Sequence, residues 1–431
     1  MNISVKELTS VDKELTLTAN REDLQESFDK AFKNYKNKIA LPGFRPGRVP
    51  VSVVKKRFGS EIELEEINKW VQTIFENKII PEHSPVGETE MLDLKWEDDK
   101  LEVVFKIGIK PTFEITDLSK VKVNKMVHDV TDKEVAEELD AILEREGNWE
   151  DVDAKATADS KVIVDVISLD EEGNPIEGDE DTDQVIDLRQ EGAKDFLKEL
   201  KGKKVGDVVD MNLEDGDRKD RFRVTIKKIQ KLIKAELNEA FIIAQSNGEA
   251  NTEDEFNSFI KSGMQQYYDQ TSDDLLKNDI VDALVNAHED KIEVPEVFLE
   301  QVLNSYVDQL KQQQQGKFPA NFDEVVYKEE MRERGIREAK WFFISQQLQE
   351  TFDDIEINAE DIDQHISAEA ARFGATAEQL KGYYAQNPSM LEQLRVSIRE
   401  TKVFDKLEDE VKLTELSKDK YRELQEKKAK K

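Results

Sequence analysis

The sequence predicts an α+β multidomain protein with an N-terminal α/β domain, a β-rich middle domain and an all-α C-terminal domain. Its 431 residues exceed the roughly 100–200 residues of a single domain. Up to about residue 232 the chain mixes alternating apolar segments with helical ones, and from there apolar residues recur at helical spacing nearly to the end. Charged residues make up 37% of the chain, against an average of about 25%. This excess implies much surface per residue and predicts an elongated or multi-lobed molecule.

Residues 1–112 are expected to form the α/β domain. Partial alternation between Val11 and Ala19 predicts a strand, and Asn20 can then cap a helix. Proline and glycine divide the helical pattern that follows, because both residues interrupt helices. The expected elements are a helix from Asn20 to Ile39 that Pro42 ends, a short helix from Pro50 to Gly59, a helix from Ile62 to Phe75 that Pro81 ends, and a hairpin of Leu92–Trp96 with Leu101–Ile109.

Three further segments follow along the chain. The pattern in residues 113–150 predicts a connector, with a strand-like stretch to Val127 and then a helix. Residues 151–232 predict the β-rich domain, because glycine- and proline-containing turns separate its alternating segments. Residues 233–431 predict the helical domain, with arms at about 302–357 and 360–413 and a frayed basic tail at Lys427–Lys431.

One segment has a charge opposite to that of the whole chain. Residues 30–58 hold nine Lys or Arg and no Asp or Glu, whereas the chain as a whole has a formal net charge of −32. An acidic protein that excludes acid from one segment is expected to present that segment to a polyanion. At its centre, two glycines and two prolines between Gly43 and Pro50 stiffen a loop between two helices.

The loop carries an aromatic residue between basic ones. Phe44 cannot easily be buried in so short a turn, and the guanidinium groups of Arg45 and Arg48 can bind phosphate bidentately or stack on rings. A basic collar surrounds the loop, formed by Lys36, Lys38, Lys55, Lys56 and Arg57. The alternative is a solvated helix hairpin whose basic residues have no ligand. A phosphate-binding P-loop fits poorly, because no Gly-Lys-Ser/Thr follows the second glycine.

The loop sequence Gly43-Phe44-Arg45-Pro46-Gly47-Arg48-Val49-Pro50 closely resembles the ribosome-docking signature of the bacterial trigger factor family. The resemblance extends over the chain, through Trp149, Ala235–Phe241 and Ile292–Pro295. It implies an ATP-independent, cytoplasmic chaperone that binds unfolded nascent polypeptides at the ribosomal exit tunnel and forms a homodimer off the ribosome. The implied docking residues contact an exit-tunnel protein of the large subunit and 23S rRNA; they are Gly43, Phe44, Arg45, Pro46, Gly47, Arg48 and Pro50.

The middle domain resembles an FKBP-type peptidyl-prolyl isomerase whose proline pocket is eroded. Phe196 and Phe222 match two pocket aromatics of the family, but Val166 and Ile176 stand where its members usually have phenylalanine. Gln184 replaces a third aromatic. Such enzymes need no nucleophile and act by enclosing the prolyl ring, so the prediction is an isomerase activity that is very low or lost. The alternative is an active isomerase for which the helical arms deliver substrate.

The helical arms carry many large apolar residues between charged ones. Most are expected to form the core of antiparallel helix pairs, and the remainder would be exposed apolar patches of the kind that bind partners. The residues concerned are Tyr306, Leu310, Phe318, Phe322, Val326, Trp341, Phe342, Phe343, Leu348 and Phe352 in the first arm, and Met390, Leu391, Leu394, Ile398, Phe404 and Leu407 in the second.

Other chemistry is not indicated. The chain has no cysteine, and its four histidines lack metal-ligand spacing. The acidic stretch from Asp170 to Asp183 lacks the EF-hand spacing, so a solvated hairpin is the better account. No nucleotide, metal or hydrolase motif is found, and no cofactor is expected. Without an apolar leader or a membrane-spanning run, the sequence predicts a soluble protein that does not enter a membrane. An RNA-binding scaffold remains a third alternative function.

Overall fold

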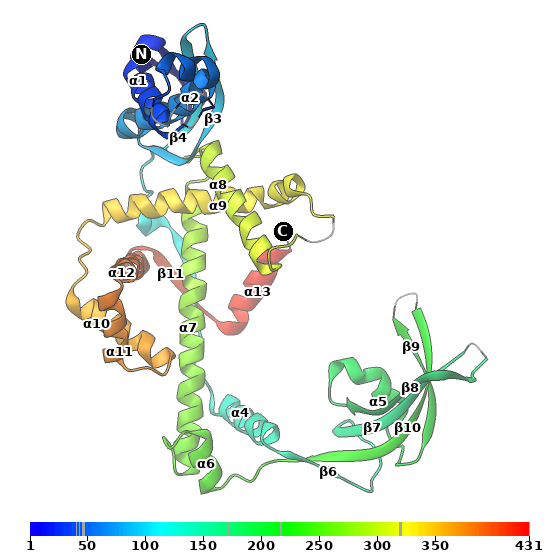
Figure 1. The fold of residues 1–431 in the computed structure, drawn as a ribbon. Coiled ribbons are helices and arrows are strands. Elements are labelled where there is room, and N and C mark those ends of the chain that lie inside the picture. The colour runs from blue at the N-terminus through cyan, green and yellow to red at the C-terminus, as the bar shows by residue number, and fades with distance from the viewer. Residues whose placement is uncertain are drawn as a thin grey trace. The chain divides into compact units, whose positions relative to one another are not determined.

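The computed structural model describes residues 1–39, 41–42, 44, 48–170, 172–215, 218–318 and 321–430. The chain forms two compact units. The first joins Met1–Met126 to Asp273–Leu416, and the second joins Val127–Ser272 to Ser417–Lys431. Figure 1 shows the α/β N-terminal part, the β-rich middle part and the helical C-terminal part that the sequence predicts. Among the described residues, no helix is long and apolar enough to cross a membrane.

The N-terminal part of the first unit is a four-stranded antiparallel sheet covered on one face by helices. Its strands lie in the order β1-β2-β4-β3. Leu15 lies opposite Phe105 and Leu17 opposite Val103, so one face of β2 and β4 packs on Phe28 and the other apolar residues of α1 and α2. The elements are β1 (Asn2–Glu7), β2 (Asp12–Asn20), α1 (Arg21–Lys38), α2 (Val51–Ile74), a π-turn (Phe75–Ile79), α3 (Ile80–His83), β3 (Pro85–Glu97) and β4 (Lys100–Ile109).

Two helix boundaries in this part differ from the prediction. Helix α2 runs through Gly59 without a break, and after the π-turn the helix continues past Pro81 to His83. A single glycine inside a helix costs only about 1 kcal/mol, and burial of Val54, Ile62 and the later apolar residues of α2 offsets that cost. The expected stops at Gly59 and Pro81 are therefore wrong. The expected cap of α1 is confirmed, because Asn20 and Asp23 form a capping box.

The first unit also contains most of the helical C-terminal part. Its core joins the second half of α7 to α9 and α12, and Phe343, Leu348 and Leu407 are fully buried there. Helix α8 ends at Gln313 within a run of glutamines, and Gly316 follows with a positive φ. The elements are α7 (Glu253–Ala287), α8 (Glu296–Gln313), α9 (Glu324–Thr351), α10 (Ala359–Arg372), α11 (Ala377–Gln386) and α12 (Pro388–Glu410).

The end of the chain is more ordered than expected. Strand β11 (Lys412–Ser417) pairs with β5 (Lys122–Val127) in a two-stranded sheet, where the sequence predicts helix or tail. Helix α13 (Lys418–Ala429) then includes Lys427 and Lys428, so the expected frayed tail is wrong for these residues. Burial of Tyr421 on α13 anchors the helix.

The second unit holds the β-rich middle part and a small helical part. Five strands form one sheet, in which β10 pairs with β6, β7 and β9, and β8 extends the sheet beyond β7. Val162, Val164, Val224 and Ile226 form its core with Leu200. The elements are α4 (Asp132–Arg145), β6 (Asn148–Asp151), β7 (Ser160–Leu169), β8 (Pro175–Asp187), α5 (Lys194–Leu200), β9 (Val208–Asp215), β10 (Arg218–Ile233) and α6 (Glu239–Gln245), with the first half of α7.

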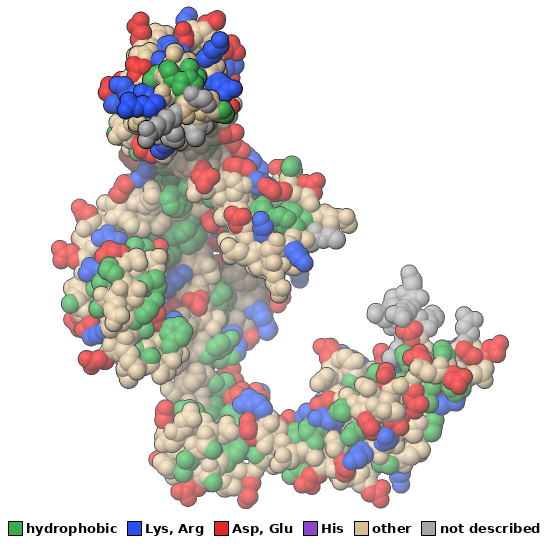
Figure 2. All heavy atoms as spheres, in the orientation of Figure 1, with side chains coloured by type: hydrophobic (Ala, Val, Ile, Leu, Met, Phe, Trp, Pro, Cys, Tyr) green, Lys and Arg blue, Asp and Glu red, His purple; other side chains and the backbone are tan. Residues whose placement is uncertain are grey.

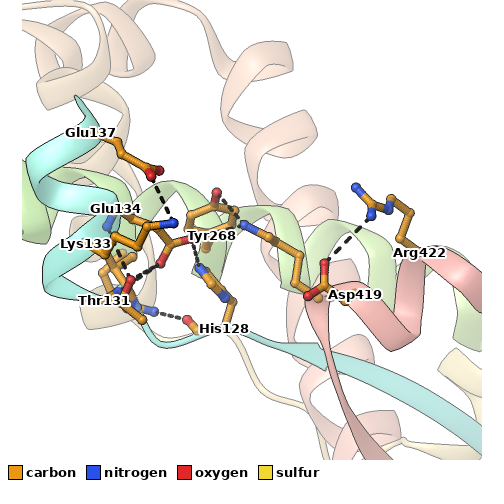
Figure 3. A network of polar contacts seen from close by, with 11 residues as sticks. His128, Thr131, Lys133, Glu134, Glu137, Tyr268, Asp419 and Arg422 are labelled. Carbon is orange, nitrogen blue, oxygen red and sulfur yellow. Dashed lines mark hydrogen bonds and ion pairs between the residues drawn. The ribbon is translucent and has the colours of Figure 1, made fainter. Parts of the chain in front are cut away.

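A polar network around Glu134 connects the C-terminal helix to the rest of this unit (Figure 3). Thr131 and Glu134 form a capping box at the start of α4. His128 Nε2 lies 2.9 Å from Glu134 Oε1, and Lys418 Nζ donates to the same oxygen at 3.3 Å and to the Tyr268 hydroxyl at 3.0 Å. Lys418 on α13 thus joins Glu134 on α4 to Tyr268 on α7.

The Glu134 network predicts a loss of stability in acid. Hydrogen bonds from the Thr131 backbone N–H and hydroxyl, with further help from Lys418 and His128, lower the pKa of Glu134 to about 2. The unfolded-state pKa of glutamate is about 4.3, so the ionised carboxylate stabilises the fold above that pH and the contribution is lost as the pH falls towards 2. In thermal unfolding followed by circular dichroism, we expect Glu134→Gln to lower the melting temperature at pH 6 and to have little effect near pH 2. Glu137→Gln, which removes an exposed carboxylate from the same helix, is the control. A Glu134→Gln effect that does not change with pH would contradict the prediction.

Candidate functional site

The loop between α1 and α2 is held at both ends by the hydrophobic core. Leu41 and Val49 are buried in the cluster that joins the sheet to α1 and α2. The backbone N–H of Phe44 donates to the Leu41 carbonyl at 3.0 Å, and the Phe44 side chain is 40% exposed. The core thus fixes the base of the loop and leaves an aromatic ring at the surface, an arrangement suited to contact with a partner.

The predicted docking residues of this loop fall into two groups. Phe44, Arg48 and Pro50 are described, and all three are exposed. Gly43, Arg45, Pro46 and Gly47 lie outside the described residues. The sequence identifies Phe44 and Arg48 from the motif, but it does not single out Leu41 and Val49 as anchors. The available signal was their apolar character on either side of a polar turn.

The residues of the basic collar differ in their exposure and in their contacts with the domain. Lys38, Lys56 and Arg57 are exposed, and Lys36 is half-buried. Lys55 is exposed too, but its Nζ lies 3.6 Å from Asp29 Oδ1 and 4.8 Å from the centre of the Phe32 ring, so it also contacts α1. Figure 2 shows Lys and Arg side chains on the visible face of the N-terminal part. The name docking surface is used below for the described residues of the loop and the collar, namely Phe44, Arg48, Pro50, Lys36, Lys38, Lys55, Lys56 and Arg57.

The docking surface is suited to bind a polyanion. Exposed cations on α1 and α2 attract phosphates and release counterions from a nucleic acid, which makes the binding sensitive to salt. An exposed aromatic ring and an exposed arginine on the same loop add directional contacts, since aromatic and arginine side chains carry much of the energy of protein interfaces. The cations on α1 and α2 are therefore suited to long-range attraction, and Phe44 and Arg48 on the loop are suited to local contact.

The four residues that the sequence predicts as a residual isomerase pocket are only partly brought together. Phe196, Phe222 and Val166 are half-buried and pack on the core of the β-rich part. Val166 lies opposite Val224, two residues after Phe222 on β10, so Val166 and Phe222 are diagonal neighbours in the sheet. Ile176 is 44% exposed on β8. The structure thus brings three of the four predicted residues to one cluster and places the fourth at the surface.

The helical part exposes several large apolar side chains. Among the residues that the sequence singles out, Phe318, Val326, Phe342 and Met390 are exposed. Tyr306, Phe343, Leu348, Phe352, Leu394, Ile398 and Leu407 are buried. The sequence could not separate the two sets, because both recur at helical spacing. Some exposed apolar residues were missed altogether, namely Val325, Phe373, Tyr383 and Val396.

A surface depression of about 380 Å³ lies among α10, α11 and α12. Apolar Phe373, Met390 and Leu394 line it together with polar His365 and Arg372. Phe373 is 74% exposed. Apolar surface with polar groups at its border is typical of sites that bind other polypeptides. Among the described residues, no group of three or more His, Asp or Glu side chains is placed to hold a metal ion.

Trigger factors from other organisms are similar to this chain over nearly its whole length. Two family models, described as bacterial trigger factor protein (TF) and its C-terminus, match residues 1–142 and 252–409. The trigger factor of Salinibacter ruber is 25% identical, with 98% of this chain and 96% of the relative covered. The trigger factor of Chlorobaculum tepidum is 27% identical, with 96% and 98% covered. A solved structure of a trigger factor chaperone has a TM-score of 0.53 at 22% identity, covers 95% of this chain and 100% of its own, and shares the fold.

Proposed function

The chain belongs to the bacterial trigger factor family, and on that premise we propose that it is an ATP-independent, ribosome-associated chaperone for nascent polypeptides. The observation that carries the proposal is the loop between α1 and α2. Its ends are anchored in the core by Leu41 and Val49, and it exposes Phe44 and Arg48 beside a cluster of cations in a strongly acidic chain. The test is ribosome binding by a loop variant, which is described in the Discussion.

Each part of the chain has a proposed role. Residues 1–112 bind the ribosome, at an exit-tunnel protein and 23S rRNA, and residues 113–150 connect this domain to the rest. Residues 151–232 form the isomerase-like domain. Residues 233–431 form the chaperone domain, which holds unfolded segments on exposed apolar side chains such as Phe342 and Phe373. The protein acts in the cytoplasm, and off the ribosome it forms a homodimer.

The middle domain is proposed to have little or no isomerase activity. A proline pocket needs apolar walls on opposite sides of the ring. Phe196 and Phe222 supply one side, while Ile176 points to the surface and Gln184, opposite Val164 on β7, is exposed. The competing function, an active isomerase, is favoured only by the clustering of Phe196, Phe222 and Val166.

Deletion of the middle domain should leave the chaperone activity in place. Glu150 pairs with Lys231 and Asn148 pairs with Ile233, so the two ends that remain after removal of 151–232 lie next to each other in the β6–β10 ladder. A short Gly-Ser linker can therefore join them. We expect the shortened protein to suppress aggregation of a denatured enzyme as well as the full chain does. Loss of that activity would favour the isomerase as the main function.

The full chain provides the complementary measurement on the isomerase. An uncatalysed X–Pro isomerisation has a time constant of roughly 10–100 s, and we expect the full chain to leave the rate of a proline-limited refolding reaction nearly unchanged. An intact FKBP domain serves as the positive control. Acceleration comparable to that control would contradict the proposal.

A further inference from the structure

The N-terminal domain contacts the first arm helix through a buried carboxylate. Asp12 begins β2 and is only 7% exposed. Its Oδ1 accepts a hydrogen bond of 3.0 Å from the backbone N–H of Glu296, the first residue of α8. The residue before Glu296 is Pro295, which offers the helix no side-chain cap. Asp12 therefore caps α8 from a position 284 residues away in the sequence.

The turn that leads into β2 holds the backbone of Asp12 in place, and the Thr9 hydroxyl donates to its other carboxylate oxygen, Oδ2, at 3.4 Å. The Thr9 hydroxyl accepts from the backbone N–H groups of Val11 and Asp12 at 3.1 and 3.0 Å. The carbonyl of Asp12 accepts from the N–H groups of Leu8 and Thr9 at 2.9 and 3.1 Å. Next to the cap, Ser10 donates to the carboxylate of Glu293. An acceptor fixed by its own turn loses little conformational entropy when it caps the helix.

Two glycines allow α8 to approach the sheet closely. A Cβ on Gly108 of β4 would lie 2.7 Å from Pro295 Cβ and 2.9 Å from Val297 Cγ2. A Cβ on Gly87 of β3 would lie 2.7 Å from Phe298 Cα. Neither glycine tolerates a side chain while α8 remains in this place. The backbone of the domain and the start of the arm are thus built to fit each other.

From this geometry we propose that Asp12 is a positioning residue that locks the N-terminal domain onto the first arm. Strand β2 runs from Asp12 directly into α1 at Asn20, and α1 leads to the docking surface. Helix α8 is joined to α9 by Arg332, whose Nη2 donates to both carboxylate oxygens of Glu296 at 3.0 and 3.1 Å. A cap at Asp12 therefore sets the direction of the arm relative to the docking surface. A role of this cap in presenting the arm to nascent chains rests on the proposed function. The contact between Asp12 and α8 does not.

The absence of cysteine allows a direct test with spin labels on the full chain. Asn34 on α1 and Gln309 on α8 are exposed, and each is replaced by a labelled cysteine. Pulsed electron resonance then measures the distribution of distances between the two labels. We expect one narrow distribution for the parent, and for Asp12→Ala a second, broader population whose ratio to the first rises roughly tenfold, as expected for loss of an N-cap.

Matched variants separate the cap from other effects. Asp12→Asn keeps an acceptor oxygen and should behave as the parent, since asparagine caps helices as well as aspartate does. Glu296→Pro removes the N–H donor at a helix position where proline is favoured, and ψ 133° of Pro295 suits a following proline. It should broaden the distribution. Glu296→Ala keeps the donor, loses the pair with Arg332 and should not.

The distance distributions test the proposal independently of the ribosome assay, because they are measured on the free protein. Narrow distributions for both Asp12→Ala and Glu296→Pro would overturn it. Broadening by Asp12→Asn equal to that by Asp12→Ala would also overturn the cap as the cause. If Asp12→Ala unfolds the N-terminal domain, Glu296→Pro decides, because it leaves that domain unchanged. Failure of the proposed function would appear instead as absent ribosome binding by the parent protein.

Discussion

Replacing Phe44, Arg45 and Arg48 together by alanine should abolish co-sedimentation with ribosomes. The exposed Phe44 ring and the Arg48 side chain stand on a loop whose base is buried, so their removal leaves the domain core intact. Truncating a hot-spot aromatic or arginine typically costs about 2 kcal/mol or more, and the joint loss of three such residues should weaken binding by more than about 100-fold. Binding is measured by pelleting ribosomes through a sucrose cushion at fixed salt.

A charge-matched control shows whether the loop or net charge matters. Lys30→Ala with Lys69→Ala removes two positive charges, as the loop variant does. Both lysines lie outside the loop, in ion pairs of 2.6 Å with Glu26 and Glu65. We expect this control to bind ribosomes nearly as well as the parent. Unchanged binding by the loop variant would disprove the docking assignment. Binding to naked 23S rRNA as tight as to ribosomes would favour the RNA scaffold.

The exposed loop between α1 and α2 could be predicted from the sequence because its information is local, and its docking role stays a prediction. Charge, proline, glycine and the motif all lie within residues 30–58. The engagement of Lys55 could not be predicted in the same way. Its partners Asp29 and Phe32 lie on the preceding helix, and only the packing of α1 on α2 brings them near. A count of charges along the chain cannot distinguish a lysine held by its own domain from one offered to a partner.

Long-range pairing accounts for the errors in the fold. The segment Lys412–Ser417 has leucines three residues apart, a spacing that also fits a helix, and it becomes β11 because β5, about 290 residues earlier, supplies a partner strand. The helix through Gly59 has a similar origin, since burial on a distant sheet outweighs the local preference of glycine. The cap of α8 by Asp12 likewise joins residues with no common sequence signal.

Phe343 and Phe342 are neighbours on α9 with opposite expected roles, and Phe343→Ala should be among the most destabilising single changes in the helical part. Phe343 is fully buried, and its ring centre lies 5.0 Å from that of Phe298. Replacing a buried phenylalanine by alanine typically costs about 3–5 kcal/mol. We expect hydrogen exchange of amides in α7 and α9 to show this loss, because it reports local stability in a multidomain chain.

Phe342→Ala is the matched comparison. Its side chain is 40% exposed and contacts Phe298, so we expect a cost of about 0.5–1.5 kcal/mol for the lost ring contact. If exposed apolar residues hold unfolded polypeptides, this variant should keep its hydrogen-exchange protection and yet suppress aggregation of a denatured enzyme less well than the parent. An unchanged aggregation assay would remove Phe342 from the client-binding surface. Similar exchange losses in the two variants would contradict the division between buried and exposed residues. Because the substitutions are identical and adjacent, a difference between them reports the direction in which each ring points on α9.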